Sequence, residues 1–457
     1  MMLTGRRASI RRFNIATATA LALTLSMGAD AQRQPSPLPI TDHFNLDFYG
    51  TVNYTDNVYL TRNGQQGQVV LQPRVDVDYL RPGGVVESEI TGRFEGRDYL
   101  GGAFGSDLIG NLNGRVNWHA MPGRLDWVFE DFLTTAGINP ISRSTPNDVQ
   151  LANVAVTGPT LRARFAPRLN GQLDLRYARS DAQTTNDFDG NRLAAAGRLM
   201  YILTPTSTTG LNLAVQEARY DTAPVSTDFD RKDATVVFER RGSNNSLSVE
   251  AGYTWLDFLG NGGSFSGNLI RAHASYKITP RASIAVEIGR QYTDAANSMQ
   301  VNSPLVGQVT VNSGLSRISI TPDIYREKRA GVSFRYRGDT WSTRVEPFIR
   351  DVAYLHPNEF AIDMQGRGLD IYADYRFTPL WMLSTYLHIE NGKYPSLNAN
   401  DDNRLLSTYL LYQFARRWAW RFEYTYNQRD SDLPGFTYKE NVIGASLIYR
   451  RYEEIQK

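Results

Sequence analysis

Charged side chains recur at every second position in several extended segments of this 457-residue chain. In a β-strand this spacing places the charges on one face. Both signs are interleaved, so the charges can pair across neighbouring strands and form a hydrated wall. They can also produce a transverse field or a ladder of polar contacts that guides a hydrophilic solute. The residues that carry this pattern are Arg74, Asp76, Glu87, Glu89, Arg93, Glu95, Arg97, Arg344, Glu346, Arg350, Asp370, Asp374, Arg421 and Glu423.

Catalytic motifs are sparse by comparison. The chain has five histidines and contains neither a paired-histidine zinc motif nor a G-x-S-x-G nucleophile elbow. His119 could pair with a serine across the barrel, while His273 and His388 fall on polar strand faces and are expected to be solvated. We therefore predict that the protein is not an enzyme.

Two acidic loops are candidate metal sites, and the acidic pair Asp401-Asp402 is an equally weak one. Carboxylate oxygens at close spacing suit calcium, and DFDGN at 187–191 resembles part of a calcium loop but lacks the closing glutamate. Solvated loop carboxylates are the favoured interpretation, so no metal and no cofactor is predicted. The residues concerned are Asp181, Asp187, Asp189, Asp228 and Asp230.

The segments that position the charges alternate apolar and polar residues. In QVVLQPRVDVDYL (Gln68–Leu80), one face carries mostly apolar side chains and the other carries Arg74, Asp76 and Asp78. This period of two is typical of a strand with one apolar and one polar face. Pro73 and Pro347 each remove a backbone donor from such a strand, and bulges are the expected accommodation.

The connections between these segments alternate between short and long. Because Pro and Gly mark most of the short ones as turns, the alternation predicts 20 strands, with 18 or 22 as alternatives. The short turns lie at 81–84, 121–124, 166–170, 204–207, 241–245, 278–281, 337–339, 378–380 and 415–417. The long loops lie at 56–67, 100–106, 133–148, 180–190, 221–231, 257–265, 293–327, 355–365, 391–402 and 428–436.

This pattern distinguishes a membrane barrel from a soluble sandwich. Outer-membrane barrels have short periplasmic turns, long extracellular loops, an apolar face toward lipid and a polar face toward the lumen. We therefore predict an all-β transmembrane antiparallel β-barrel. The loop 293–327 resembles a hairpin in part; it either extends above the membrane, folds into the lumen, or adds two strands.

Aromatic residues near the short turns predict one girdle at a membrane–water interface. The alternative is that aromatic residues are simply good strand formers. The residues are Tyr79, Trp118, Tyr201, Tyr276, Tyr336, Trp341, Phe377, Trp381, Phe414 and Trp418.

The first residues have the features of a secretory signal peptide. A basic start precedes the apolar stretch Ile15–Leu25, and Ala29-Asp30-Ala31 matches a small-x-small cleavage site. We predict a signal peptide at 1–31, a periplasmic segment at 32–42, the barrel at 43–452 and a C-terminal tail at 453–457. The absence of cysteine excludes disulfides and a lipoprotein anchor, and a net charge of +2 gives no reason to expect a nucleic-acid partner.

Three segments carry a resemblance to a known family. LDFYGTVNYTDNVYL (46–60), WVFEDFL (127–133) and STPNDVQLANVAVTGP (144–159), in this order, resemble the type 2 β-barrel porin family of bacterial outer-membrane proteins. The resemblance implies an outer-membrane pore linked to exopolysaccharide or capsule export. One departure is the C-terminus, where the aromatic residue that ends such barrels is replaced by Tyr449 or Tyr452 followed by a short tail.

The combined expectation is a pore for hydrophilic solutes in the outer membrane, with exopolysaccharide export as the specific hypothesis. Its partners would be outer-membrane lipid, the barrel-assembly machinery, the solute or polysaccharide and, for polymer export, a periplasmic delivery protein. The alternative is a plugged structural or adhesive barrel that acts through its external loops.

Overall fold

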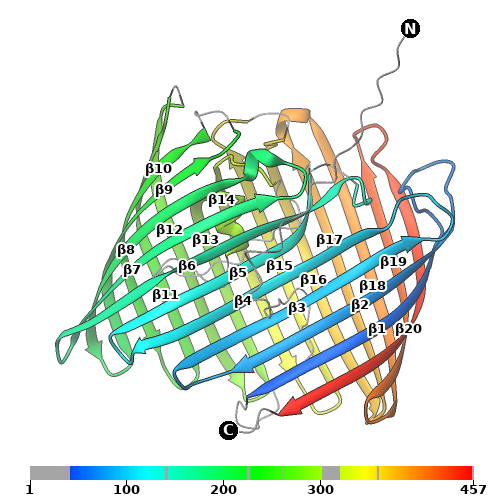
Figure 1. The fold of residues 1–457 in the computed structure, drawn as a ribbon, viewed down its shortest axis with the longest axis horizontal. Coiled ribbons are helices and arrows are strands. Elements are labelled where there is room, and N and C mark those ends of the chain that lie inside the picture. Colours follow the sequence, from blue (N-terminus) through cyan, green and yellow to red (C-terminus); the bar gives the residue numbers. More distant parts are fainter. Residues whose placement is uncertain are drawn as a thin grey trace.

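A ring of 20 antiparallel strands forms the molecule in this computed structural model, which describes residues 42–138, 141, 143–223, 227–260, 262–300, 320–357 and 360–454 (Figure 1). Each strand pairs with its neighbours in the sequence, and β1 pairs with β20, so the sheet is closed. The strands are β1 His43–Thr55, β2 Gln68–Arg81, β3 Val86–Tyr99, β4 Asp107–Met121, β5 Leu125–Gly137, β6 Val149–Ala166, β7 Leu169–Ala182, β8 Gly190–Thr204, β9 Ser207–Tyr220, β10 Phe229–Arg241, β11 Asn245–Phe258, β12 Ser264–Thr279, β13 Ala282–Thr293, β14 Tyr325–Arg337, β15 Trp341–Tyr354, β16 Met364–Thr378, β17 Trp381–Tyr394, β18 Ala399–Ala415, β19 Trp418–Ser431 and β20 Tyr438–Glu454. The predicted barrel and its strand count are confirmed.

Within the described residues, three short helical segments lie in connections that follow odd-numbered strands. They are η2 Asn186–Phe188, α1 Ala295–Met299 and η5 Pro395–Leu397. The predicted alternation of loop lengths is less regular than expected, because β17 and β18 extend through most of the predicted loop 391–402 and leave only η5 between them. Most of the hairpin-like part of 293–327 lies outside the described residues.

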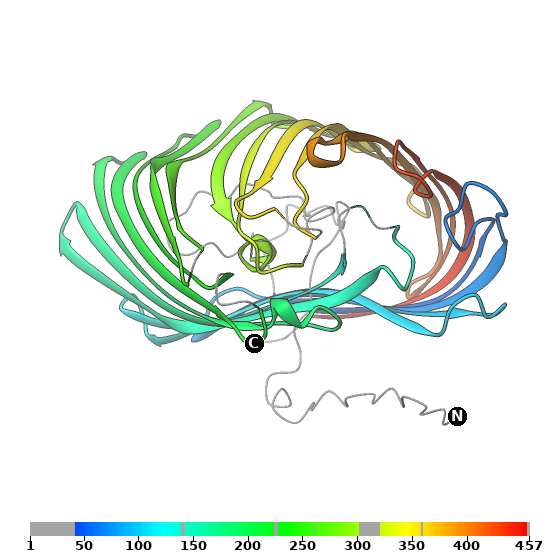
Figure 2. The same cartoon turned by 90° about the horizontal axis from the view of Figure 1, so that it is seen from above.

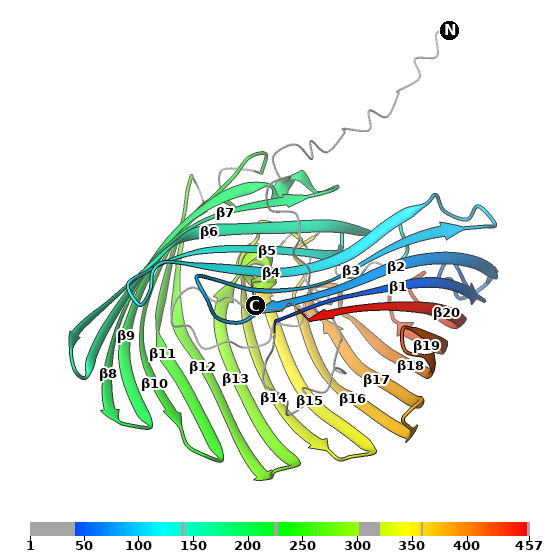
Figure 3. The same cartoon turned by 60° about the horizontal axis from the view of Figure 1, so that its bottom comes forward.

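The last strand is longer than predicted. β20 runs to Glu454, which pairs with His43 of β1, so the boundary expected at residue 452 falls inside the strand. The paired ends of β1 and β20 lie at the same end of the barrel as the short turns (Figure 3). Tyr449 is placed on the outer face, where its ring lies 5.0 Å from that of Trp418.

The strand prolines do not form bulges. Leu71 pairs with Asp98 and Arg74 pairs with Glu95, so the register is the same on both sides of Pro73 and only the pairs between them are missing. The β14–β15 ladder skips two pairs around Pro347 in the same way. The expected bulges are therefore wrong at both prolines. The register shifts found in the ladders lie beside short turns, for example between Lys277 and Thr279.

A third proline opens the β6–β7 ladder, which the sequence did not indicate. No pairs form between Gly158-Pro159 and Leu175-Arg176, although the register continues beyond them. The guanidinium of Arg176 donates to the carbonyl oxygens of Pro159 (2.8 Å) and Leu175 (2.9 Å). It thereby satisfies backbone acceptors that the ladder leaves unpaired. Such groups need a partner within the protein, because the hydrocarbon core of a bilayer contains no water that could donate to them.

Side-chain exposure shows which face is outside. In β9, Leu213 is 54% exposed and Val215 is 52% exposed, whereas Asn212 and Gln216, which alternate with them, are at most 8% exposed. In a soluble protein the apolar side chains would be buried and the polar ones exposed. The opposite arrangement recurs on other strands of the ring. Apolar faces point outward and polar faces point into the lumen, as predicted for a membrane barrel.

The ring is elongated in cross-section and α1 lies inside it (Figure 2). α1 and Ile320, which lies shortly before β14, form one apolar cluster with residues of β5–β7, β14 and β15. Since α1 follows β13, this cluster joins walls that are about eight strands apart in the ring. The segment between β13 and β14 therefore folds into the lumen in its described part, which was one of the three expectations.

Candidate functional site: the lumen wall

Strand register places all fourteen candidate pore-lining residues on the inner face. Residues opposite one another in a ladder point to the same side of a sheet, and the candidates are opposite other inner-face residues throughout. Arg74 is opposite Tyr49 and Glu95, and Asp76 is opposite Arg93. Farther round the ring, Glu346 is opposite Asp370, and Leu411 is opposite Arg421.

The candidates on β2 and β3 form ion pairs along the wall. Arg93 Nε lies 3.1 Å from Asp76 Oδ1, and Arg74 Nε lies 3.1 Å from the same oxygen. Arg97 Nε lies 3.0 Å from Glu95. The guanidinium of Arg74 also lies 3.6 Å from the centre of the Tyr49 ring. Charge on this part of the wall is therefore largely compensated in place.

A second group of candidates lies on β15 and β16, with partners on β15 and β17. Asp370 accepts from His388 Nδ1 and Tyr386 Oη, both at 2.8 Å. Asp374 accepts from Ser342 (3.0 Å) and Ser384 (2.7 Å). These bonds hold the carboxylates against the wall.

The remaining candidates are also engaged. Arg350 lies 3.4 Å from Glu390, and Arg344 lies 3.5 Å from Glu346. On β19, Arg421 lies 2.8 Å from Glu423. Glu87 lies 3.4 Å from His119 Nε2, and Glu89 is exposed opposite Arg115 of β4.

Several ion pairs of the lumen were missed. Arg271 of β12 lies 3.0 Å from Glu250 of β11, and Arg429 of β19 lies 2.6 Å from Asp401 of β18. All four side chains are at most 6% exposed. Their alternate positions carry the same signal as the fourteen candidates, so a more complete count of strand parity would have found them.

The inward segment is anchored by a buried network. Asp294 caps α1 by accepting from the backbone of Asn297 (2.8 Å), and its second oxygen lies 2.5 Å from Arg192 of β8. Arg192 also donates to Tyr220 Oη (2.7 Å), which donates in turn to the carbonyl of Pro322 (3.1 Å). Both ends of the described segment are thus bonded to the β8–β9 wall.

A second connection enters the ring from another side. The β5–β6 connection places the carbonyl of Ile141 2.7 Å from Arg429 of β19. The Ile141 side chain packs against Ile362, Met364 and Tyr394 near β16 and β17. Because β16–β19 lie on the far side of the ring from β5 and β6, this connection crosses the lumen at the loop end.

The histidine and acidic-loop candidates have separate local partners. His119 lies between two carboxylates, with Nδ1 2.6 Å from Asp126, rather than beside a serine. Asp189 accepts from the backbone of Ala182 (2.8 Å), and Asp228 accepts from that of Tyr220 (2.9 Å). In the described ranges, no three His, Asp or Glu side chains are grouped as metal ligands.

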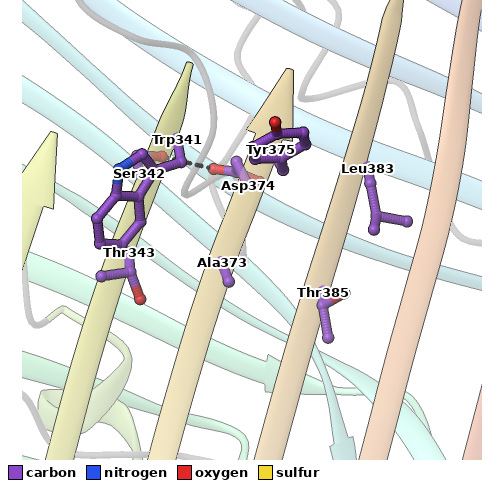
Figure 4. A pocket seen from close by; sticks show the side chains of 8 residues that line it. All are labelled: Trp341, Ser342, Thr343, Ala373, Asp374, Tyr375, Leu383 and Thr385. Carbon is purple, nitrogen blue, oxygen red and sulfur yellow. Dashed lines mark hydrogen bonds between the residues drawn. The ribbon is translucent and has the colours of Figure 1, made fainter. Parts of the chain in front are cut away.

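The outer face carries the predicted aromatic residues beside the short turns. Trp118, Tyr276 and Trp341 are between 46% and 50% exposed. Figure 4 shows a shallow pocket here, in which the small side chains of Thr343, Ala373 and Thr385 lie among larger ones. Outward-facing aromatic rings thus gather at one end of the barrel, where the sequence predicts the aromatic girdle.

These features together decide the location of the protein. A closed ring leaves no unpaired sheet edge in lipid, and its apolar outer surface with aromatic residues at the short-turn end fits a bilayer. The chain is an outer-membrane β-barrel. Among the described residues, no helix has the length and apolarity needed to cross a membrane.

Comparisons with known proteins add little beyond the fold. No family model and no curated protein matches the sequence, so the resemblance to type 2 β-barrel porins stays a prediction. The FrpB iron transporter of Neisseria meningitidis, in its apoprotein form, is 9% identical with a TM-score of 0.48, over 91% of this chain and 82% of that one.

Two Pseudomonas aeruginosa proteins give similar values. The siderophore receptor PirA is 10% identical with a TM-score of 0.44, over 92% of this chain and 81% of that one. OccK2 is 10% identical with a TM-score of 0.37, over 90% of this chain and 98% of that one. Likeness at this level carries no information about the solute of this barrel.

Proposed function

We propose that this barrel is a water-filled pore that carries hydrophilic solutes across the outer membrane. The observation that supports it most is a closed ring of 20 strands with a polar inner face. A ring of this size encloses more space than side chains fill. α1 and the β5–β6 connection narrow that space, so they would set the upper size of a solute.

Along β2, β3 and β19, the paired wall charges suit the hydroxyl groups of a solute better than its charged groups. Arg93 with Asp76, Arg97 with Glu95, and Arg421 with Glu423 neutralise one another locally. Paired groups keep hydrogen-bonding capacity for hydroxyl groups without presenting a large net charge. No chemical step is needed for such passage, and we propose that the protein is not an enzyme.

Exopolysaccharide export is the more specific form of this proposal. It is supported by the family resemblance of the three sequence segments described above. Export of a long polymer would need a periplasmic partner that delivers it, and the short turns between even- and odd-numbered strands would be the docking face.

One observation favours a second candidate, a barrel closed at rest that acts through its external surface. Two connections fold inward from different walls, one bonded to Arg192 and the other to Arg429. If together they block the lumen, no solute would pass and the loops would carry the function.

Uptake of neutral sugars into liposomes separates the two candidates. Liposomes that contain the refolded barrel should swell in glucose and more slowly in larger oligosaccharides, because the narrowed lumen selects by size. Folding is checked by the heat-modifiable migration of the barrel on gels. Absence of swelling with folded protein would reject the pore and favour the closed barrel.

A further inference from the structure

Four arginines face one another where β14 and β15 pair on the lumen wall. Arg329 is opposite Arg350, and Arg335 is opposite Arg344. Like charges directly opposite one another in a ladder are destabilising. This arrangement contrasts with other parts of the wall, where Asp76 of β2 is opposite Arg93 of β3.

The nearby carboxylates do not compensate all four cations. Arg350 pairs with Glu390 and Arg344 lies 3.5 Å from Glu346. Arg329 and Arg335 have no carboxylate within ion-pair distance among the residues that the structure describes. Two nearby acids have other partners: Glu327 accepts from Gln291 (3.0 Å), and Glu287 lies 3.4 Å from His273.

Two of the four guanidinium groups lie beside aromatic rings. Arg329 lies 5.4 Å from the centre of the Phe348 ring, and Arg344 lies 3.9 Å from that of Tyr372. Stacking on a ring orients the guanidinium plane and leaves N–H groups for an anion. Nε of Arg329 is buried without a hydrogen-bond partner in the described structure, whereas Nε of Arg344 faces Glu346 at 3.5 Å. Arg335 is exposed on the inner face.

The two arginine pairs are separated along the strand. Arg329 and Arg335 are six positions apart on β14, which corresponds to about 20 Å in an extended strand. A small anion would contact one pair at a time. A chain of acidic sugars would contact both pairs at once, and the second contact would be intramolecular and therefore strengthen binding.

We propose that Arg329, Arg335 and Arg344 form a binding track for the carboxylate groups of an acidic oligosaccharide in the lumen, with the buried Arg350 adding its positive charge behind Arg329. Arginine suits this ligand because its planar guanidinium donates two parallel hydrogen bonds to a carboxylate. The proposal rests on the proposed pore function and specifies its solute. A carboxylate at each pair would also relieve the repulsion between the opposed arginines.

The test measures block of the single-channel current by oligogalacturonate added to the reconstituted barrel. We expect block by the wild type, at least tenfold weaker block in both Arg329→Gln and Arg335→Gln, and little change in Arg198→Gln. Arg198 is a matched control because it is a lumen arginine of β8 that pairs with Glu239 at 3.0 Å. A neutral dextran oligomer of equal length should block none of them.

Equal block of the wild type, Arg329→Gln and Arg335→Gln would overturn the track, as would equal block by dextran. If inorganic phosphate displaced the oligomer at a concentration equal to that of the oligomer, the arginines would be a general anion site, and this result would also overturn the track. If the folded wild type does not conduct, the pore proposal fails, and calorimetric titration of the same variants with oligogalacturonate then tests the track alone.

Discussion

Arg192 of β8 and Asp294 at the start of α1 form an ion pair of 2.5 Å in which both side chains are at most 3% exposed. The two residues are 102 positions apart, and their contact fixes the inward segment against the barrel wall. A buried charge that loses its partner is costly. This pair therefore holds the feature that narrows the lumen.

Asp294→Asn should loosen the inward segment. Asparagine can still cap α1 by accepting from Asn297, so the helix keeps its N-cap while the ion pair is lost. We expect larger and noisier single-channel current than in the wild type. Asp187→Asn, which removes an exposed carboxylate in another loop, is the control; an unchanged current in Asp294→Asn would show that the ion pair does not hold the constriction.

Arg176→Met should destabilise the barrel by about 1–3 kcal/mol for each backbone acceptor left without a donor. The affected backbone acceptors are the carbonyls of Pro159 and Leu175. The change also removes the hydrogen bond to Thr160 and the ion pair with the buried Asp174, which adds to the loss. Urea unfolding in lipid or detergent measures the change. Arg179→Met on the same strand removes only half-exposed ion pairs, so its effect should stay below about 1 kcal/mol; equal losses in the two variants would contradict the role of Arg176.

Gly158→Ala should impair folding. Gly158 has φ +154°, and an added Cβ would overlap the carbonyl oxygen of Leu175. We expect a lower yield of the heat-modifiable folded form. Gly197→Ala is the matched control because nothing lies near its added Cβ, and an equally high yield for both variants would show that β6 tolerates a side chain at this position.

Arg271→Met should be more harmful than the double variant Glu250→Gln/Arg271→Met. The single change leaves Glu250 buried without its cation, which typically costs roughly 3–5 kcal/mol, whereas the double change removes both charges. A double-mutant cycle from urea unfolding gives the coupling. Additive losses would mean that this pair does not contribute as a pair.

The mature protein should begin at Gln32. The predicted cleavage after Ala31 lies outside the described residues, and it can be checked by intact mass spectrometry of the protein purified from outer membranes. A mass that includes residues 1–31 would reject the signal-peptide prediction.

The barrel and its faces were predictable because strand periodicity is local. Alternation in β2 already separates Arg74 and Asp76 from the outward side chains, and the strand register places both on the inner face. The effect of Pro73 was not predictable, since a skipped pair and a bulge have the same sequence signal. The skipped pairs at Gly158-Pro159 were not predictable either, because they involve a hydrogen bond from Arg176 of the next strand to the carbonyl of Pro159.

The contacts across the lumen could not be predicted. Asp294 and Arg192 become partners only when the ring has closed and the β13–β14 connection has folded inward. The opposed arginines of β14 and β15 were also missed, because strand parity gives the face of a residue but not its partner. Register is what places Arg335 opposite Arg344.

Single-channel conductance of the refolded mature chain in a planar bilayer tests the central claim most directly. An open pore narrowed by the inward segment predicts steady conductance that rises in Asp294→Asn. No conductance in either protein, with folding verified by heat-modifiable gel migration, would contradict the pore and leave a closed barrel that acts through its surface.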